Sequence, residues 1–395
     1  MPALLIRGGR PWGRPEPADM LVEDGVIVRV GERLDAPGGT DIIDADGLLV
    51  LPGLVEAHTH LDKSLFGGPW IPHSAGDDLA DRIANDRRRR GELGIPDVDR
   101  IVALLERMVA SGTTHVRSHT DVDPEVGLRG VEAVREAAER LAGRVTVEQA
   151  AFPQHGVLTE PGTAELLEDA LRGGVPCVGG IDPAGMDRDP VGQLDVILGL
   201  AERHGARVDV HLHDPGSLGV WELELIAERT RKHGLGGRVA VSHAYGFSDA
   251  GAAVQDRVIE QLAAAGVSLV TAAVYSFPVP PIERLRAAGV AVACGHDGIR
   301  DLWGPYGSGA MLERAMHVAY RSTFRRDEDI ELALEAATYG GAAVLGLEAY
   351  GLSPGDRADL VLVDASTPAE AVVTHPTPAV VLKEGRVVAR DGALA

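Results

Sequence analysis

The chain has 395 residues, of which 45% are hydrophobic and 25% are charged, and its formal net charge is −21. This composition is typical of a soluble globular protein, and the negative charge disfavours binding to nucleic acids and to anionic membranes. No apolar segment is long enough to cross a bilayer, and the N-terminus lacks the extended apolar segment of a signal peptide, so we expect a cytoplasmic protein. The length predicts one large domain and a smaller one.

Short strands and tight turns are predicted at both ends of the chain. Apolar and polar residues alternate in the first fifty residues, with turn signals at Asp24-Gly25 and Asp46-Gly47. The last forty residues have the same character and contain a turn signal at Glu384-Gly385. Chain termini often lie close together. We therefore predict one small β-sandwich domain that is built from residues 1–51 and 352–395.

Between these ends, strand-like and helix-like segments alternate. The eight candidate strands are 49–58, 115–121, 145–152, 177–181, 207–213, 238–243, 267–274 and 290–296. This pattern predicts a (β/α)8 barrel of the TIM type over residues 52–351. A doubly wound open sheet is the alternative, but it is disfavoured because no G-x-G-x-x-G motif follows any strand.

The first candidate barrel strand ends in two histidines, His58 and His60. Alternate side chains of a strand point to the same side, so both imidazoles face one way. Two converging imidazoles suit a divalent transition metal ion. The pair alone is a weak signal, because fourteen histidines make chance pairs common.

Further polar residues follow the other candidate strands, where the active site of such a barrel lies. They include His119 and Asp121, Gln154, the His211–Asp214 segment, His243, and the pair His296 and Asp297. A single histidine at a strand end is more often structural than a ligand, and we give His204, His233 and His375 that interpretation. Histidines after the first, fifth and sixth strands, with an aspartate after the eighth, form a convergent set only in a closed barrel.

The run Arg87–Arg90 is the exception to the negative charge of the chain. We expect a solvated face of a helix here, with an anion-binding site as the alternative.

The motifs VEAHTHLDK, VRSHTDV, AFPQHG, DVHLHD, VSHAY and CGHDGIRDLW occur in the order seen in the cytosine deaminase branch of the amidohydrolase superfamily. The chain resembles this branch, which includes N-alkylammelide amidohydrolases, over nearly its whole length. The resemblance implies a metal-dependent enzyme with one zinc or iron ion, which would be bound by His58, His60, His211 and Asp297. It also implies that His243 contacts the water that attacks the substrate, and that Gln154, Trp303 and Lys63 lie around a heterocyclic substrate. We expect His213 to lie beside the substrate as well.

Two positions depart from the pattern of the branch. Asp214 stands where the relatives have glutamate, and Gly298 replaces a second aspartate beside Asp297. We expect Asp214 to carry a proton to the substrate, with His213 as the competing candidate. Asp214 is one methylene shorter than glutamate, and Gly298 lacks a carboxylate altogether. Together these changes predict a substrate that is shifted in the pocket or bulkier than cytosine.

The predicted activity is hydrolysis of an exocyclic carbon–nitrogen bond of a pyrimidine, triazine or pterin-like ring by a metal-activated water, with release of ammonia or a small amine. The alternatives are hydrolysis of a cyclic amide and a non-catalytic relative that binds a metal or ligand. The fourth strand contains no lysine to bridge two metals, which favours a single ion. Homo-oligomerisation and the choice between zinc and iron are left open by the sequence.

Overall fold

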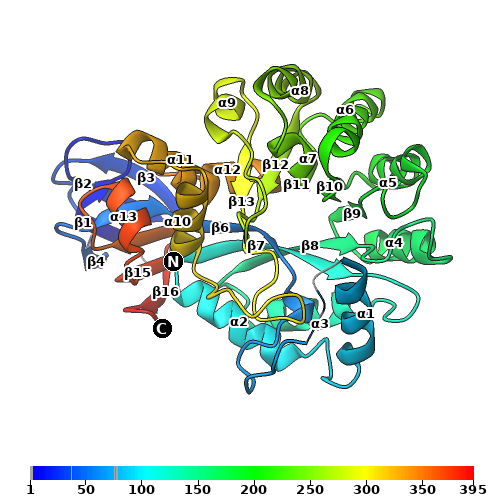
Figure 1. Cartoon of the computed structure of the whole chain (residues 1–395). Coiled ribbons are helices and arrows are strands. Elements are labelled where there is room, and N and C mark those ends of the chain that lie inside the picture. The colour runs from blue at the N-terminus through cyan, green and yellow to red at the C-terminus, as the bar shows by residue number, and fades with distance from the viewer. Residues whose placement is uncertain (1–2, 37, 75, 77–78) are drawn as a thin grey trace.

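The computed structural model describes residues 3–36, 38–74, 76 and 79–395. Eight parallel strands follow one another in sequence order around a barrel (Figure 1). They are β6 (Leu54–Thr59), β7 (Thr113–Asp121), β8 (Thr146–Phe152), β9 (Cys177–Ile181), β10 (Arg207–Leu212), β11 (Val239–His243), β12 (Val267–Thr271) and β13 (Val292–Cys294). The barrel closes where Thr59 pairs with Asp297 and the Asp297 amide donates to the carbonyl of His58 at 2.8 Å. The predicted TIM-type barrel is confirmed.

Helices surround the barrel (Figure 1). The helices up to β11 are η1 (Leu61–Lys63), α1 (Leu79–Arg90), α2 (Val98–Ala110), α3 (Arg129–Arg140), α4 (Thr163–Arg172), α5 (Pro190–His204) and α6 (Gly216–Lys232). Those after β11 are α7 (Tyr245–Ser248), α8 (Ala252–Ala265), α9 (Ile282–Ala287), α10 (Met311–Arg321), α11 (Asp327–Ala336), α12 (Tyr339–Leu345) and α13 (Pro368–Thr374). No helix in the described ranges is long and apolar enough to cross a membrane.

The strand predicted over residues 49–58 is in fact two strands that belong to different sheets. β5 (Leu49–Pro52) pairs with the terminal strands, whereas β6 starts the barrel. Gly53 separates them, and a Cβ atom at this position would lie 2.3 Å from Oγ1 of Thr114. The continuous apolar pattern hid this change of sheet, because both strands are fully buried.

Strands from both ends of the chain form one mixed sheet beside the barrel (Figure 1). Its strands are β1 (Leu4–Pro11), β2 (Ala18–Glu23), β3 (Val26–Gly31), β4 (Asp41–Asp44), β5, β14 (Leu360–Val363), β15 (Val380–Lys383), β16 (Arg386–Arg390) and β17 (Ala393–Leu394). Ile6, Met20 and Ile27 share a buried core with Leu360 and Leu382. Each terminal segment therefore buries the apolar face of the other, and the predicted small β domain beside the barrel is confirmed. The division at residues 51 and 352 stays a prediction.

Candidate metal centre

The four predicted metal ligands lie at the carboxyl ends of the barrel strands. His58 is in β6 and His60 directly follows it, His211 is in β10, and Asp297 comes three residues after β13. The three histidines are buried, whereas Asp297 exposes 29% of its side chain to the cavity. Strand alternation places His58 and His60 on one side, and closure of the barrel brings Asp297 next to them.

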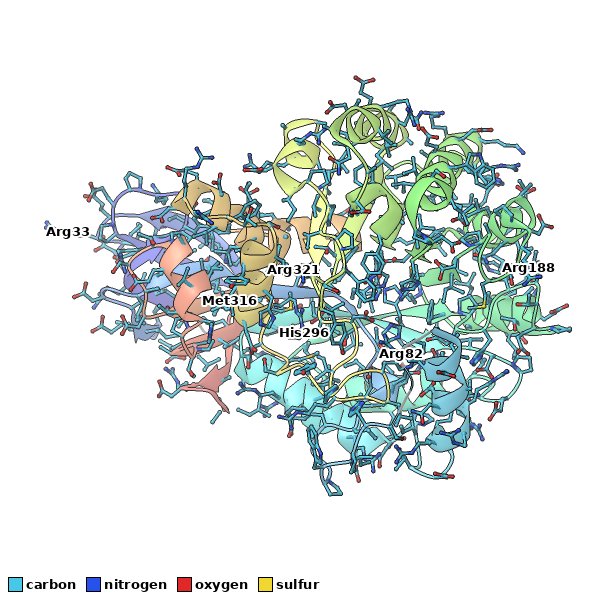
Figure 2. The ribbon with its side chains drawn as sticks, viewed as in Figure 1. Arg33, Arg82, Arg188, His296, Met316 and Arg321 are labelled. Atoms are coloured by element: carbon cyan, nitrogen blue, oxygen red, sulfur yellow. The ribbon has the colours of Figure 1, made fainter. Side chains whose placement is uncertain are left out.

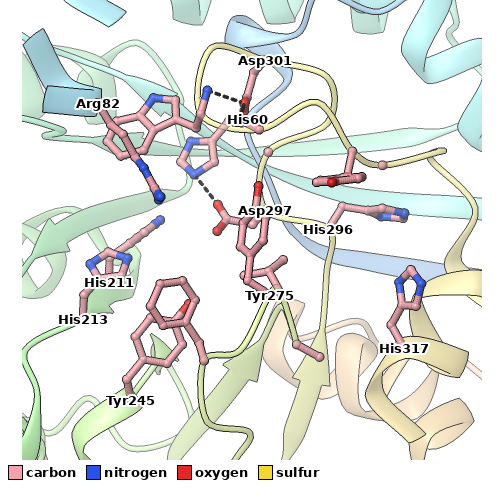
Figure 3. A pocket seen from close by; sticks show the side chains of 18 of the residues that line it. His60, Arg82, His211, His213, Tyr245, Tyr275, His296, Asp297, Asp301 and His317 are labelled. Atoms are coloured by element: carbon pink, nitrogen blue, oxygen red, sulfur yellow. Dashed lines mark hydrogen bonds and ion pairs between the residues drawn. The ribbon is translucent and has the colours of Figure 1, made fainter. Parts of the chain in front are cut away.

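The donor atoms of this group face one another at short distances. Oδ1 of Asp297 lies 3.6 Å from Nε2 of His58 and 3.3 Å from Nε2 of His60. Figure 3 shows the contact between Asp297 and His60. The ring centroids of His58 and His211 are 4.5 Å apart. His58 Nε2 and both ring nitrogens of His211 are buried without a hydrogen-bond partner among the described residues. Unpartnered buried imidazole nitrogens beside a carboxylate are the donor set expected for a divalent transition metal.

The protonation states also suit a metal. Burial lowers the pKa of His60 and His211, and neighbouring cationic or imidazole side chains lower it further, so both are neutral ligands at pH 7. Desolvation acts to raise the pKa of Asp297, but the adjacent imidazoles of His58, His60 and His243 outweigh it and hold this pKa well below its usual value. The site therefore combines neutral imidazoles with an ionised carboxylate.

A buried chain of hydrogen bonds orients His58. Nδ1 of His58 is 2.8 Å from Oγ of Ser242, which donates to Oδ1 of Asp209 at 2.7 Å. Because the single hydroxyl hydrogen goes to Asp209, Ser242 accepts from Nδ1–H of His58. The lone pair of His58 is then on Nε2, which faces Asp297. Arg117 neutralises Asp209 from the other side, 3.2 Å from its Oδ2.

His119 is a fifth histidine of the cluster, and the resemblance gave it no role. Its ring centroid lies 4.2 Å from that of His58, and both its nitrogens are buried without a partner among the described residues. His58, His119 and Asp209 also form a possible ligand set by distance. Since Arg117 already pairs with Asp209, this set fits a cation less well than the set that contains Asp297.

His243 lies at the end of β11, buried against the cluster, and by distance it forms a further possible ligand set with His58 and His211. Its ring stacks on that of His213 with centroids 4.5 Å apart, and its centroid is 4.9 Å from that of His58. Nδ1 is 3.4 Å from the hydroxyl of Tyr245, and Nε2 has no partner among the described residues. His243 adopts φ 72° and Asp297 φ 64°. Left-handed backbone at a non-glycine residue is costly and gathers at functional sites.

The two candidate proton carriers have different surroundings. Nδ1 of His213 is 2.8 Å from Oδ2 of Asp182, and both His213 and Asp214 line the cavity. Burial acts to lower the pKa of His213, but the charge of Asp182 outweighs it and raises this pKa. Oδ2 of Asp214 accepts the amide hydrogen of Gly185 at 2.8 Å. Burial and the charge of Asp182 raise the pKa of Asp214, and burial raises that of the adjacent Glu222 to about 8.

The predicted substrate contacts gather on one wall of the cavity. Nζ of Lys63 donates to Oε1 of Gln154 at 2.6 Å and pairs with Asp121 at 2.9 Å. The same nitrogen lies 5.6 Å from the ring centroid of Trp303. Gln154 thus presents its amide N–H groups as donors, while Trp303 supplies a flat apolar surface. The cavity that these residues share with the cluster has a volume of about 830 Å³.

Glu56 is a supporting residue that the sequence reasoning missed. Its side chain is fully buried, and its Oε1 accepts the amide hydrogens of His58 and His296 at 3.1 and 3.0 Å. Oε2 lies 2.5 Å from Nδ1 of His296. Glu56 ties β6 to the segment that carries Asp297. The sequence contained a signal for this residue, because Glu56, His58 and His60 occupy alternate positions and so lie on one face of the strand.

Comparison with known proteins identifies the family of the chain. Residues 96–389 match the amidohydrolase family. The chain is 33% identical to N-isopropylammelide isopropyl amidohydrolase of Pseudomonas sp. (strain ADP), over 98% of this chain and 97% of that protein. The structure of N-isopropylammelide isopropylaminohydrolase from Burkholderia multivorans ATCC 17616 is similar over 100% of both chains, with 47% identity and a TM-score of 0.96.

A second solved structure is less similar in sequence. It is 5-methylcytosine deaminase from Klebsiella pneumoniae, with 26% identity, a TM-score of 0.84 and coverage of 97% of each chain. The resemblance that the motifs suggested is confirmed. The chain belongs to the amidohydrolase family and is a hydrolase of carbon–nitrogen bonds.

Proposed function

We propose that this protein is a metal-dependent aminohydrolase that cleaves an exocyclic carbon–nitrogen bond of a triazine or pyrimidine ring and releases ammonia or a small amine. The observation that carries this proposal is the convergence of unpartnered buried imidazole nitrogens and the Asp297 carboxylate on one cavity. The substrates in the names of the similar proteins, N-isopropylammelide and 5-methylcytosine, support the choice of ring.

The cluster would hold one divalent ion, zinc or iron, through His58, His60, His211 and Asp297. When bound, such an ion lowers the pKa of a water molecule toward neutrality and so supplies a nucleophile at pH 7. A single ion is favoured because β9, with the sequence CVGGI, has no lysine to bridge two metals.

Hydrolysis needs two proton movements, and the chain provides a group for each. His243 accepts the proton of the attacking water through its free Nε2, while the water oxygen bonds to the ring carbon. A proton must then reach the leaving nitrogen, so that the carbon–nitrogen bond breaks and the ring keeps the oxygen. His213 can deliver it from Nε2, because its Nδ1 is held by Asp182. The assignment of this step to Asp214 stays a prediction that competes with His213.

The opposite wall would hold the ring during these steps. Trp303 offers a flat face, and the amide group of Gln154, fixed by Lys63, offers hydrogen-bond donors. Contacts of this kind orient the reacting carbon toward the nucleophile, which contributes more to the rate than binding alone. Lys63 itself is held by Asp121, so it acts on the ring mainly through Gln154.

The proposal is tested by incubating the purified, zinc-loaded or iron-loaded protein with N-isopropylammelide, ammelide, cytosine and pterin. Amine or ammonia release is measured, and mass spectrometry of the product separates exocyclic cleavage from ring opening. We expect exocyclic cleavage of at least one ring, and its loss in His58→Ala. A ring-opened product, or binding of these compounds with no turnover, would contradict the proposal.

A further inference from the structure

Helix α1 lies at the mouth of the barrel and is attached there by two of its arginines. Arg90 is buried and pairs with Asp123 at 3.1 Å and with Glu125 at 2.8 Å. Arg87 pairs with Glu160 at 2.8 Å. These acids follow β7 and β8 in the chain, at the end of the barrel where the cavity opens. The expected solvated face is therefore wrong for Arg90, which is buried, whereas Arg87 pairs with acids but keeps 37% of its side chain exposed.

The same face of α1 carries Arg82 into the cavity. Arg82, Asp86 and Arg90 are spaced by four residues and so lie on one side of the helix. Asp86 and Arg90 are buried. Arg82 lines the cavity onto which the proposed metal ligands His60, His211 and Asp297 open. Figure 2 shows Arg82 on the side of α1 that faces the barrel, and Figure 3 shows its side chain extending into the pocket.

Arg82 differs from the other arginines of α1 in its lack of a partner. Within the described ranges, no hydrogen bond or ion pair reaches its guanidinium, although the side chain is half-buried. The other four each have one or more: Arg87 with Glu160, Arg88 with Asn85, Arg89 with Ser74, and Arg90 with Asp123. A partly desolvated guanidinium without an acceptor gains free energy when a ligand supplies one.

The other lysine and arginine side chains of the cavity already have acceptors. Lys63 is engaged by Asp121 and Gln154, Arg314 donates to the carbonyl of Ala272 at 2.6 Å, and Arg321 donates to that of Phe277 at 2.8 Å. Nε of Arg314 is also without a partner, but among the described lining residues Arg82 is the guanidinium that no protein acceptor reaches.

We propose that Arg82 is a specificity-determining residue that binds an oxygen of the substrate ring. This contact would select an amino- or alkylamino-heterocycle with an acidic oxo group. The exocyclic oxygen of that group carries full or partial negative charge. This inference rests on the proposed function and narrows its substrate. A guanidinium discriminates strongly here, because a ring that carries an amino group at the same place has no acceptor to offer.

The test compares wild type, Arg82→Gln and Arg82→Lys, with Arg88→Gln as the matched control on the exposed side of the same helix. Calorimetry with the metal-loaded proteins measures binding of 2,4,6-trihydroxy-1,3,5-triazine and of 2,4,6-triamino-1,3,5-triazine, and steady-state kinetics with N-isopropylammelide give kcat and KM. Thermal unfolding checks that each variant is folded.

In Arg82→Gln we expect Kd for the trihydroxy ring and KM for N-isopropylammelide to rise by about 10- to 100-fold, the range for a hydrogen bond to a charged group. We expect kcat and the affinity for the triamino ring to change little, Arg82→Lys to recover part of the loss, and Arg88→Gln to resemble wild type. Equal losses for both rings, no loss at all, or a wild type that binds neither ring would overturn the assignment of Arg82. A wild type that binds the trihydroxy ring through Arg82 but releases no amine from any substrate would contradict only the proposed function.

Discussion

At the scale of single residues, the proposed site has one group of side chains that would hold a metal and another that would move protons. The distinction depends on which ring nitrogen of each histidine is already hydrogen-bonded to a protein group and which is free. Ser242 fixes Nδ1 of His58 and directs Nε2 to the proposed metal position, whereas Asp182 fixes Nδ1 of His213 and leaves Nε2 for the cavity. A neutral ligand such as His58 and a proton carrier such as His213 can therefore lie close together in the same site.

The first prediction concerns this division. His58→Ala and Asp297→Ala should lose both metal and activity, because each removes one of four ligands. His243→Asn should keep about one equivalent of metal and lose turnover by about two to four orders of magnitude, the range for a general acid–base group. Elemental analysis and amine release, measured on the same preparations, check both statements. Metal loss in His243→Asn as large as in His58→Ala would assign His243 to the ligands.

The second prediction separates the two proton carriers. His213→Asn removes the group that Asp182 holds toward the cavity, whereas Asp214→Asn removes a carboxylate that already accepts from Gly185. If His213 delivers the proton, His213→Asn should lower kcat by about 100-fold or more, and Asp214→Asn should cost less.

Metal content should stay near that of wild type in both variants. Substrates with a better leaving group should restore part of the kcat of the variant that lacks the proton carrier. The reverse order of the two losses would return the role to Asp214, as the sequence alone suggested.

At the scale of elements, strand alternation and the order of β and α segments were enough to predict the barrel and the histidines at its strand ends, whereas the proposed set of four metal ligands came from the resemblance to the family. They could not reveal where one sheet ends and another begins. Residues 49–52 and 54–59 form one apolar run in the sequence, and only the close approach of Thr114 to Gly53 shows why the run is divided. Arg82 could not be predicted either, because its position depends on how α1 is attached to the loops after β7 and β8.

The third prediction tests the junction at Gly53. Gly53→Ala places a Cβ atom 2.3 Å from Oγ1 and 2.5 Å from Cγ2 of Thr114, both of them buried. Because neither strand can yield without breaking its pairing, we expect a loss of about 1–3 kcal/mol in the free energy of unfolding. Urea denaturation measures it. Gly91→Ala is the control, since a Cβ atom there meets nothing within 4 Å. An unchanged midpoint for Gly53→Ala would show that the junction is not tightly packed.

At the scale of the whole molecule, a buried polar network joins the barrel to the terminal sheet. His115 in β7 lies 3.1 Å from Nζ of Lys383 in β15, and this nitrogen pairs with Asp359 at 2.8 Å. All three side chains are buried. The lysine donates to both neighbours, which requires His115 to be neutral and to accept through Nε2. Protonation of His115 would therefore break this contact between barrel and sheet.

The fourth prediction follows from the pKa of His115. Burial, with a further contribution from the charge of Lys383, lowers this pKa from 6.5 to about 3. In the unfolded chain His115 therefore takes up a proton near pH 6.5, whereas in the folded chain it does so only near pH 3. The contribution of neutral His115 to the free energy of unfolding is thus complete above pH 6.5 and is lost as the pH falls below it. The loss should reach about 1.4 kcal/mol per pH unit.

Urea denaturation of wild type and His115→Gln at pH 7, 6 and 5 measures this contribution as a difference, which cancels the other titrating groups. We expect wild type to lose more stability than His115→Gln between pH 6 and pH 5, by about 1 kcal/mol. His204→Gln, on the exposed surface of α5, should follow wild type at each pH. Parallel curves for wild type and His115→Gln would mean that His115 takes up its proton in the folded protein as readily as in the unfolded chain, and that the contact between barrel and terminal sheet does not depend on its charge.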